Sequence, residues 1–343
     1  MTLWLVLPLA FVASFCLTSA MRRYALRQSL IDVPGARSSH SVPTPRGGGV
    51  AIVLVVASAL FGLVCFDLMS ESLVWTVVGA GLAVALLGFI DDHGHIAARW
   101  RLLGHFIAAG WAVFWLGGLP AITVFGATMD LGWLGTLLTL LFLVWMLNLY
   151  NFMDGIDGLA SVEAISVCLG VLLCYAAAGI ETKVSGLVEW LLVAAVAGFA
   201  CWNFPRARIF MGDAGSGFLG ITIAVLALNA AWVAPQLLWS WLILLGVFVV
   251  DATFTLWRRL LRGDALYEAH RSHAYQLAAR RIGSHVPVTV TVALINLLWL
   301  LPWALGAAVE SIDGAVALLL TYVPLIALCA WLRAGSAERS RDM

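Results

Sequence analysis

Four polar side chains recur at a three-residue spacing where a long apolar stretch of the chain ends: Asn148, Asn151, Asp154 and Asp157. Asn148 and Asn151 fall on one face of a helix, and a glycine after each carboxylate ends that helix. Amide and carboxylate oxygens are the ligands that hard cations such as Mg²⁺ or Mn²⁺ prefer. The run therefore predicts a cation site at a membrane edge. The alternative is a helix end capped by Asn and Asp as turn residues.

Three further carboxylates stand at the borders of apolar stretches. Asp91 and Asp92 directly follow one stretch, and adjacent like charges of this kind favour a cation or a phosphate-bearing partner. Asp213 precedes Gly-Ser-Gly at a predicted helix N-terminus, where free N–H groups and the helix dipole favour phosphate. A solvated helix end for the pair and a plain N-cap for Asp213 are the alternatives.

Arginines lie in two of the loops beside these carboxylates. Arg37 and Arg46 stand in the loop 32–49, whose prolines and glycines are typical of a structured loop that contacts phosphate. Arg206 and Arg208 stand a few residues before the Gly-Ser-Gly run. The alternative for the loop 32–49 is a positive-inside anchor with a glycine-rich entry to the next helix.

A third basic group consists of His270, Arg271 and His273. Two histidines three residues apart with an arginine between them could grip a diphosphate or donate a proton. Contact with lipid headgroups is the alternative for this segment. It follows an apolar stretch that contains Asp251, a proton-relay or ligand candidate that could equally pair with Arg258 or Arg259.

The elements that position these residues are membrane helices. The chain is 62% hydrophobic and 11% charged, against about 25% charged residues in a soluble domain. We therefore predict an all-α polytopic membrane protein with one domain, residues 1–343, and no nucleic-acid partner. Eleven apolar stretches are long enough to span: 3–20, 47–66, 73–90, 102–118, 133–150, 160–179, 187–203, 214–232, 236–256, 287–308 and 313–332. Residues 122–128 between two of them could form a short hairpin.

The distribution of arginines predicts the orientation of these helices. With an outside (periplasmic) N-terminus, every arginine falls on one side and the single lysine, Lys183, on the other. The arginine side is then the cytoplasm, and the C-terminus lies there. The predicted cytoplasmic connections carry all of the polar clusters: about 21–46, 91–101, 151–159, 204–213 and 257–286.

In order and spacing, these motifs resemble those of the polyprenyl-phosphate N-acetylhexosaminyl-1-phosphate transferase superfamily, the glycosyltransferase family 4 type, over nearly the whole chain. The loop from Asp32 to Gly49 and the run His270-Arg-Ser-His273-Ala-Tyr-Gln276 look closest to the branch that starts bacterial O-antigen or related surface glycans. The superfamily also contains the peptidoglycan-precursor translocase, which typically has consecutive histidines and phosphate-contacting lysines. Here Arg271 and Ser272 separate the two histidines, and the predicted cytoplasmic side has no lysine.

The resemblance implies a role for each motif. Asn151 and Asp213 would ligate Mg²⁺ or Mn²⁺, while Asp91 and Asp92 would position or deprotonate a lipid phosphate. His270 or His273 would contact the transferred diphosphate. The implied substrate-binding residues are Asn148, Asp154, Asp157, Arg37, Arg46, Arg206, Arg208 and Arg271. Which of these arginines holds the diphosphate stays open, as does whether Asn148 only braces its neighbour.

The resemblance implies transfer of N-acetylhexosamine 1-phosphate from a UDP-sugar to undecaprenyl phosphate, with release of UMP. It also implies a multi-pass protein of the bacterial inner membrane, its active site facing the cytoplasm, and a homodimer. The identity of the hexosamine cannot be read from these loops. A proton-coupled transporter is the alternative from another class, but it predicts midplane carboxylates and repeated topology, and only Asp251 lies deep.

Overall fold

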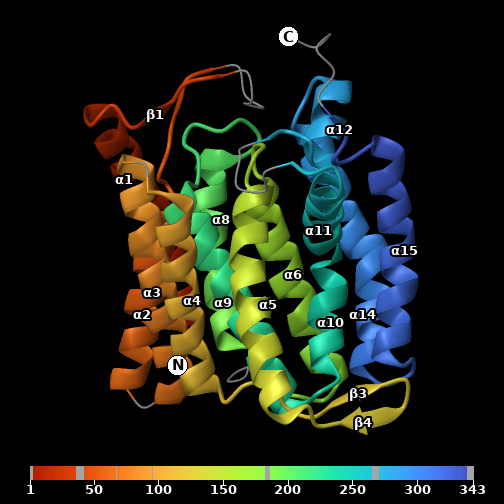
Figure 1. The fold of residues 1–343 in the computed structure, drawn as a ribbon. Helices are drawn as coiled ribbons and strands as arrows, with labels where there is room; N and C mark the ends of the chain where they lie inside the picture. Colours follow the sequence, from red (N-terminus) through yellow and green to blue (C-terminus); the bar gives the residue numbers. More distant parts are fainter. Residues whose placement is uncertain are drawn as a thin grey trace.

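A computed structural model describes residues 3–35, 42–66, 68–94, 96–181, 186–264 and 270–337. The chain forms one bundle of roughly parallel helices, with a hairpin at the lower end and the polar loops at the upper end (Figure 1). The first helices are α1 (Leu3–Arg27), α2 (Val50–Cys65), α3 (Glu71–His93), α4 (Ala98–Leu116), α5 (Gly132–Met153), α6 (Leu159–Ala177) and α8 (Leu187–Asn203). The later ones are α9 (Asp213–Val233), α10 (Leu237–Leu244), α11 (Gly246–Leu261), α12 (Ala274–Ile282), α13 (Val286–Leu294), the π-helix η1 (Ile295–Leu300), α14 (Leu301–Ala308) and α15 (Gly314–Leu332).

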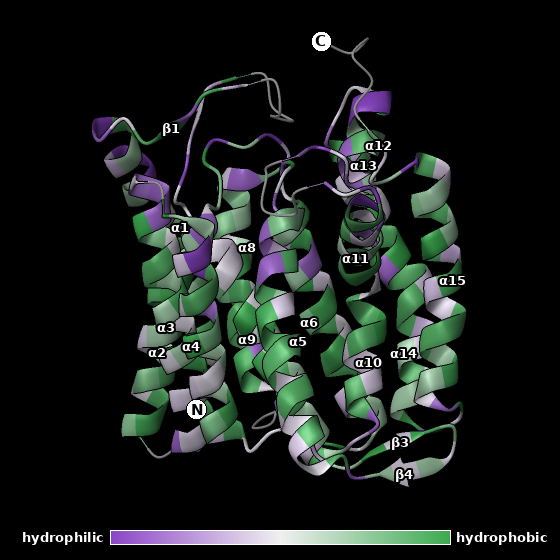
Figure 2. Ribbon diagram, viewed as in Figure 1, coloured by the Kyte–Doolittle hydropathy of each residue, from purple (hydrophilic) through white to green (hydrophobic). Residues whose placement is uncertain are grey.

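The polytopic all-α prediction is confirmed. Each of the eleven predicted ranges holds a helix or a continuous series of helical segments. Among the described residues, seven helices are long and apolar enough to cross a membrane, and the bent pair α10–α11 is an eighth if it is counted as one span. The helices α2 and α8 are apolar but shorter. Apolar residues cover the helices, whereas hydrophilic residues gather at the upper end (Figure 2). The count of eleven crossings and the orientation remain predictions.

Two predicted spans are interrupted. The range 236–256 is not one helix, because α10 and α11 meet at an angle of 65°. The second helix of this pair, α11, begins at Gly246, where a Cβ would lie 3.1 Å from a ring carbon of Tyr322 in α15. Glycine has a low helix propensity, and its missing side chain lets the neighbouring helix approach at the bend. The range 287–308 contains the π-helix η1, a local irregularity that apolar periodicity does not reveal.

The helix α9 forms the centre of the bundle. It packs against α3 and α5. Of the residues in its most apolar 18-residue stretch, 83% are buried, whereas the corresponding share in α1 is 17%. Glycines allow this close approach: a Cβ on Gly88 of α3 would lie 2.5 Å from the nitrogen of Ala214, and one on Gly220 would lie 2.7 Å from the Cα of Leu147. The upper ends of α3, α5 and α9 therefore meet within a few ångströms of one another.

The predicted hairpin is confirmed as β3 (Ile122–Val124) paired with β4 (Ala127–Met129) in antiparallel register. It lies at the end of the bundle opposite the polar loops (Figure 1). A second small pair, β1 (Ile31–Asp32) and β2 (Thr44–Pro45), ties the two ends of the first loop together. That loop starts later than predicted, because α1 continues to Arg27.

Candidate active site

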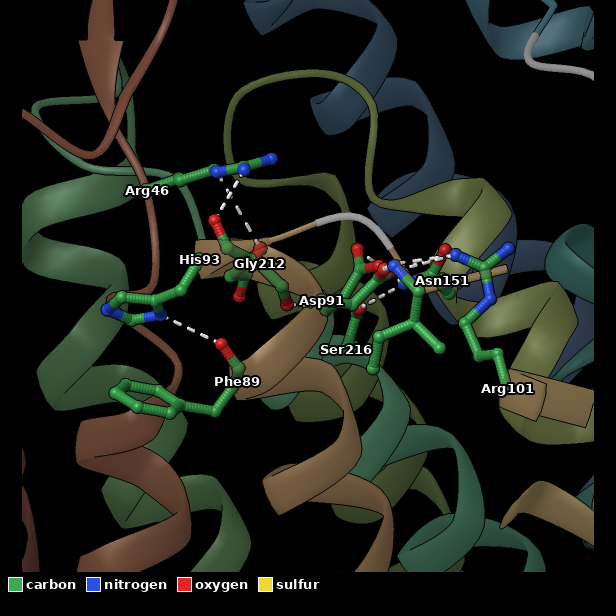
Figure 3. A network of polar contacts seen from close by, with 11 residues as sticks. Arg46, Phe89, Asp91, His93, Arg101, Asn151, Gly212 and Ser216 are labelled. Atoms are coloured by element: carbon green, nitrogen blue, oxygen red, sulfur yellow. Dashed lines mark hydrogen bonds and ion pairs between the residues drawn. The ribbon is translucent and has the colours of Figure 1, made fainter. Parts of the chain in front are cut away.

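Polar residues from three helices meet at the upper end of the bundle (Figure 3). Asp91 and Asp92 belong to the last turn of α3, Asn151 to the last turn of α5, and Asp213 is the first residue of α9. The sequence predicts the end of each helix from the end of its apolar stretch. The four side chains come together because α3 and α5 pack on α9.

Both carboxylate oxygens of Asp91 are engaged by the segment that follows α3. Oδ1 accepts a hydrogen bond from the backbone nitrogen of Ile96 at 2.8 Å, and Oδ2 accepts one from Nη1 of Arg101 at 2.7 Å. The same nitrogen lies 3.7 Å from Oδ2 of Asp213. Arg101 is therefore the cation between two carboxylates of the site (Figure 3).

Asp92 lies deeper and joins α3 to the start of α9. It is 4% exposed, and its Oδ1 lies 3.8 Å from Nε of Arg46. Its Oδ2 is buried and has no hydrogen-bond partner in the described parts of the chain. A Cβ on Gly212 would lie 2.6 Å from that oxygen, and Gly212 has a φ of +78°, so this position requires glycine twice over.

Asn151, Asp213 and Ser216 form one hydrogen-bonded group. Nδ2 of Asn151 donates to Oδ1 of Asp213 at 2.9 Å and to the hydroxyl of Ser216 at 3.0 Å. That hydroxyl donates to the carbonyl of Gly212 at 3.1 Å. Since the amide nitrogen faces the carboxylate, Oδ1 of Asn151 is left to contact another group.

The oxygen donors of this group suit a hard cation that a substrate completes. Oδ1 of Asn151 and the carboxylate of Asp213, whose side chain is 35% exposed, offer oxygen atoms of the kind that such cations bind, and the buried Oδ2 of Asp92 lies against Gly212, next to Asp213. In the described ranges, no three His, Cys, Asp or Glu side chains make a metal site by themselves. Mg²⁺ usually takes one or two carboxylates together with substrate phosphates and water. The residues present therefore fit Mg²⁺ shared with a phosphate.

Asn148 faces the interior of this site. It lines a cavity of about 20 Å³ together with Arg101, His105, Asn151 and Asp213, which is room for about one water molecule. Its Nδ2 donates to the carbonyl of Val144 within α5 at 2.7 Å. No direct hydrogen bond between the two predicted asparagines is formed among the described contacts, so bracing of Asn151 by Asn148 has no support here.

Asp154 and Asp157 separate after α5 ends. The nitrogen of Asp154 bonds to the carbonyl of Asn151 at 3.2 Å. Removal from bulk water raises the pKa of the Asp154 carboxyl well above its usual range, and the charges of Asp213 and Asp92 raise it further. Asp154 therefore belongs to the same acidic group as the helix ends.

Asp157 lies instead at a larger cavity of about 710 Å³. Its Oδ1 is 3.3 Å from Nδ1 of His285, and its carbonyl accepts from the hydroxyl of Thr289 at 2.9 Å. Phe210 and Arg206 line the same cavity, which thus combines an aromatic ring, a carboxylate and a guanidinium. This composition is typical of a ligand pocket with a few oriented polar groups.

The five predicted arginines do not share one place. Arg46 lies against Asp92, and Arg206 lines the large cavity. The guanidinium of Arg208 lies 5.9 Å from the centre of the Trp202 ring, on the side of α8 that contacts α1. Arg271 is partly exposed between the two histidines. Arg37 is outside the described residues.

The two histidines have different surroundings. His273 is 2% exposed, and its Nδ1 lies 3.3 Å from Oδ1 of Asp251. His270 is less buried and stacks on it with ring centres 4.8 Å apart. The neighbours of Asp251 are α12 and His273. Arg258 instead bonds to the carbonyl of Ala334, and Nε of Arg259 lies 3.7 Å from Oδ2 of Asp264.

Sequence reasoning missed two residues that the structure places at these sites. Arg101 was counted only as an orientation signal, although its position ten residues after a carboxylate at the start of α4 was visible. His285 carried no motif signal, because its pairing with Asp157 joins residues 128 apart in the chain.

The sequence is similar to proteins of known name. The profile described as "Glycosyl transferase family 4" matches residues 74–231, which include Asp91, Asn151 and Asp213. A "Probable undecaprenyl-phosphate N-acetylglucosaminyl 1-phosphate transferase" of Bacillus subtilis is 28% identical over 277 residues, 78% of this chain and 75% of that protein. A "Decaprenyl-phosphate N-acetylglucosaminephosphotransferase" of Mycobacterium tuberculosis is 29% identical over 87% of this chain and 80% of its own.

A "Phospho-N-acetylmuramoyl-pentapeptide-transferase" of Shouchella clausii is also similar, with 29% identity over 73% of this chain and 80% of its own length. These relatives transfer different sugar phosphates, but they agree on the class of reaction. The polar helix ends, the membrane bundle and these relatives point to one class of enzyme. The chain is a phosphotransferase, and its sequence is similar to the polyprenyl-phosphate N-acetylhexosaminyl-1-phosphate transferase superfamily.

Proposed function

We propose that the protein transfers an N-acetylhexosamine 1-phosphate from a UDP-sugar to undecaprenyl phosphate and releases UMP. The observation that carries this proposal is that Asp91, Asn151 and Asp213 meet beside Arg101 at one end of a membrane bundle, with Asp92 next to them at Arg46. A lipid phosphate and a water-soluble sugar nucleotide can meet only at such an interface. The arginine distribution supports a cytoplasmic location, in a bacterial inner membrane.

The large cavity beside Asp157 is our proposed nucleotide pocket. Its volume of about 710 Å³ falls within the roughly 300–1,000 Å³ of ligand pockets. Phe210 offers a ring for stacking on a base, Asp157 offers acceptor oxygens, and Arg206 offers charge for phosphate. Asp157 stays in place because His285 and Thr289 bond to it.

Mg²⁺ or Mn²⁺ is the proposed cofactor, held by Asn151 and Asp213. When bound, the cation would neutralise charge on the diphosphate that is transferred. Ser216 orients the amide of Asn151, so the residue is prepared to present its oxygen. Arg101 adds a positive charge beside the same carboxylate.

Asp91 orients Arg101 in our proposal and does not act as a nucleophile. Its two oxygens are already bonded to Ile96 and Arg101. A phosphate monoester has a second pKa of about 6, so the lipid phosphate is mostly ionised at neutral pH without a base. Its oxygen would attack the β-phosphorus of the UDP-sugar, and the bond from that phosphorus to the bridging oxygen would break as UMP leaves. Phosphorylated enzyme trapped with UDP-sugar in the absence of lipid would contradict this direct displacement.

The pathway proposed is the start of O-antigen or related surface-glycan synthesis. UDP-N-acetylglucosamine is the first donor to test, because relatives named for N-acetylglucosamine transfer cover up to 92% of the chain. The second candidate is the peptidoglycan-precursor reaction, which the similarity to the Shouchella clausii protein favours. Arg271 and Ser272, which separate the two histidines, argue against it.

The test uses the full chain in lipid nanodiscs with undecaprenyl phosphate. The donors are UDP-N-acetylglucosamine, its 6-deoxy relatives and UDP-N-acetylmuramoyl-pentapeptide, each with Mg²⁺ or EDTA. We expect UMP release and a lipid-linked sugar with one N-acetylhexosamine donor, abolished by EDTA. Product formation that survives chelation contradicts the metal requirement. Product only from the pentapeptide donor selects the second candidate, and no product from any donor contradicts the transferase.

A further inference from the structure

Four hydrogen-bond donors surround the carboxylate of Asp251. It lies in α11, is 3% exposed and accepts hydrogen bonds from the backbone nitrogens of Ala274 at 2.8 Å and Tyr275 at 2.9 Å. The hydroxyl of Thr255 donates to it at 3.0 Å, and Nδ1 of His273 lies at 3.3 Å. Two of these donors are free N–H groups of the first turn of α12. The carboxylate therefore caps that helix from a neighbouring helix.

The capped end of α12 packs directly on the turn that follows Asn151. The ring of His273 stacks on that of Phe152 with centres 6.4 Å apart. The hydroxyl of Tyr275 donates to the carbonyl of Phe152 at 2.9 Å. A side chain on Gly155 would collide with that hydroxyl. Any shift of α12 would therefore reach the turn between Asn151 and Asp154.

The contact with Asp251 also determines which ring nitrogen of His273 carries the hydrogen in the neutral ring. Of the two neutral tautomers, only the one with Nδ1–H can donate to this carboxylate, and in that tautomer Nε2 is the acceptor nitrogen. The ring is then fixed beneath His270, with an angle of 27° between the two planes. His270 in turn bonds to the hydroxyl of Ser272 through Nδ1 at 3.0 Å. The orientation of the outer histidine thus depends on that of the inner one.

We propose that Asp251 is a positioning residue for the transfer reaction. Through the first amides of α12 and Nδ1 of His273, it holds the segment from His270 to His273 against the Asn151–Asp154 turn. His270 and Arg271 are thereby kept beside the diphosphate. This inference rests on the proposed function for its kinetic consequence, while its structural part can be tested without any substrate.

A carboxylate is required because four donors face two oxygens. In Asp251→Asn, one oxygen becomes an NH₂ group that points at N–H groups, and at least one buried donor loses its acceptor. Loss of a hydrogen bond to a charged group predicts a fall in kcat/KM of about 10- to 100-fold. The change in shape is minimal, so a folded protein with a displaced segment is expected.

The first test reads the tautomer of His273. The chain has seven histidines, so ¹⁵N-histidine NMR of the full protein in nanodiscs is tractable, with His273→Gln for assignment. At pH 8 we expect the Nδ1–H form for His273 in the wild type and a gain of the Nε2–H form in Asp251→Asn. An Nε2–H form in the wild type would overturn the proposal whatever the activity.

The second test is kinetic and has a matched control. Glu189→Gln removes another span carboxylate, 2% exposed and bonded to the hydroxyl of Tyr175. We expect kcat/KM to fall in Asp251→Asn, to stay within about threefold in Glu189→Gln, and to fall little further in Asp251→Asn/His273→Gln. Equal losses in the two single variants would assign the effect to a buried charge in general and overturn the proposal. A wild type inactive with every donor contradicts the proposed function, while the tautomer still decides the positioning.

Discussion

Two adjacent carboxylates at the end of α3 have different surroundings and therefore different roles. Asp91 has both oxygens bonded and directs Arg101 toward Asp213. Asp92 is buried against Gly212, the residue before α9, and its Oδ2 has no hydrogen-bond partner among the described residues. The adjacent negative charges of Asp91 and Asp92 predicted a cation beside them. In this structure the positive groups beside them are two arginines, Arg101 and Arg46.

Arg101→Gln tests the role of this arginine. We expect kcat to fall by about 100-fold or more, because a positive charge aimed at developing phosphate charge is lost. The measurement is UMP release at saturating donor and lipid. Arg99→Gln is the matched control, because Arg99 has the same charge two residues away but is exposed and lies 5.7 Å from the Trp100 ring. Equal losses in both variants would show that only the local charge matters.

Asp213→Asn tests the metal assignment without relying on activity. The substitution keeps the shape and removes the charge that a divalent cation requires. We expect millimolar Mg²⁺ to raise the unfolding temperature of the wild type by a few degrees and to leave that of the variant unchanged. Asp130→Asn at the opposite end of the bundle is the control, since the contact that the structure describes for Asp130 is a hydrogen bond from the nitrogen of Gly132. A Mg²⁺-induced shift that persists in Asp213→Asn contradicts the assignment.

His270 gives a prediction on pH. Burial, followed by the nearby charges of His273 and Arg259, lowers the pKa of His270 to about 3. The ring is then neutral in the ligand-free protein at pH 5–8, although an unfolded chain titrates near 6.5. Its ¹³C resonance should not move across that range. Because the unfolded state takes up the proton, wild-type stability should fall below pH 6.5 and His270→Asn should lose less. A midpoint near pH 6.5 for His270 would contradict this.

At the scale of elements, the site depends on how closely α3 and α5 approach α9. Helix contacts in membranes favour small residues, which let backbones meet. Gly88 fills that role where α3 meets α9, and Gly220 where α9 meets α5. The broken pair α10–α11 contributes by a different means, because α11 carries the carboxylate that caps α12.

Gly88→Ala tests this dependence. The added methyl would meet the backbone of α9 at 2.5 Å, so the helices must separate, at a cost of about 1–3 kcal/mol. We expect a lower unfolding temperature and at least a tenfold loss of activity, since Asp91 and Asp213 move apart. Gly110→Ala in α4 is the control, because a Cβ there meets nothing within 4 Å. Its unfolding temperature and activity should match the wild type, and a Gly88→Ala variant that also matches would contradict the packing account.

At the scale of the whole molecule, the bundle has two unlike ends. Hydrophilic segments gather at one end, where α3 and α5 end and α9 and α12 begin, and the β3–β4 hairpin lies at the other (Figures 1 and 2). The described chain begins at the hairpin end and finishes at the polar end (Figure 1). This arrangement is the one that an odd number of crossings produces, which agrees with eleven.

Cysteine labelling tests the orientation. In a variant without the six native cysteines, Ala127→Cys on β4 and Gln28→Cys after α1 mark the two ends; both positions are exposed. With a membrane-impermeant maleimide on intact cells, we expect labelling at 127 and none at 28 until the cells are lysed. The cysteine-free protein gives the background. The reverse pattern would place the polar end outside and contradict a cytoplasmic active site.

The sequence by itself determined the helices and the residue types of the site. Apolar length is a local property, so every predicted span met a helix, and an arginine count needs no contacts. The bend at Gly246 and the π-helix were not predicted, because both depend on neighbouring helices and not on apolar length.

Only the tertiary structure decided which motif residues share a site and which lie apart. Asn151 and Asp213, which the resemblance grouped together, are 62 residues apart in the chain and are joined by a hydrogen bond. Asp157, however, turns to His285 and a separate cavity, and Asp251 turns to α12 instead of an arginine. Such partners come from helices distant in sequence, and periodicity carries no information about which faces meet. The sequence thus named the chemistry of the site, and helix packing assigned each residue its partner.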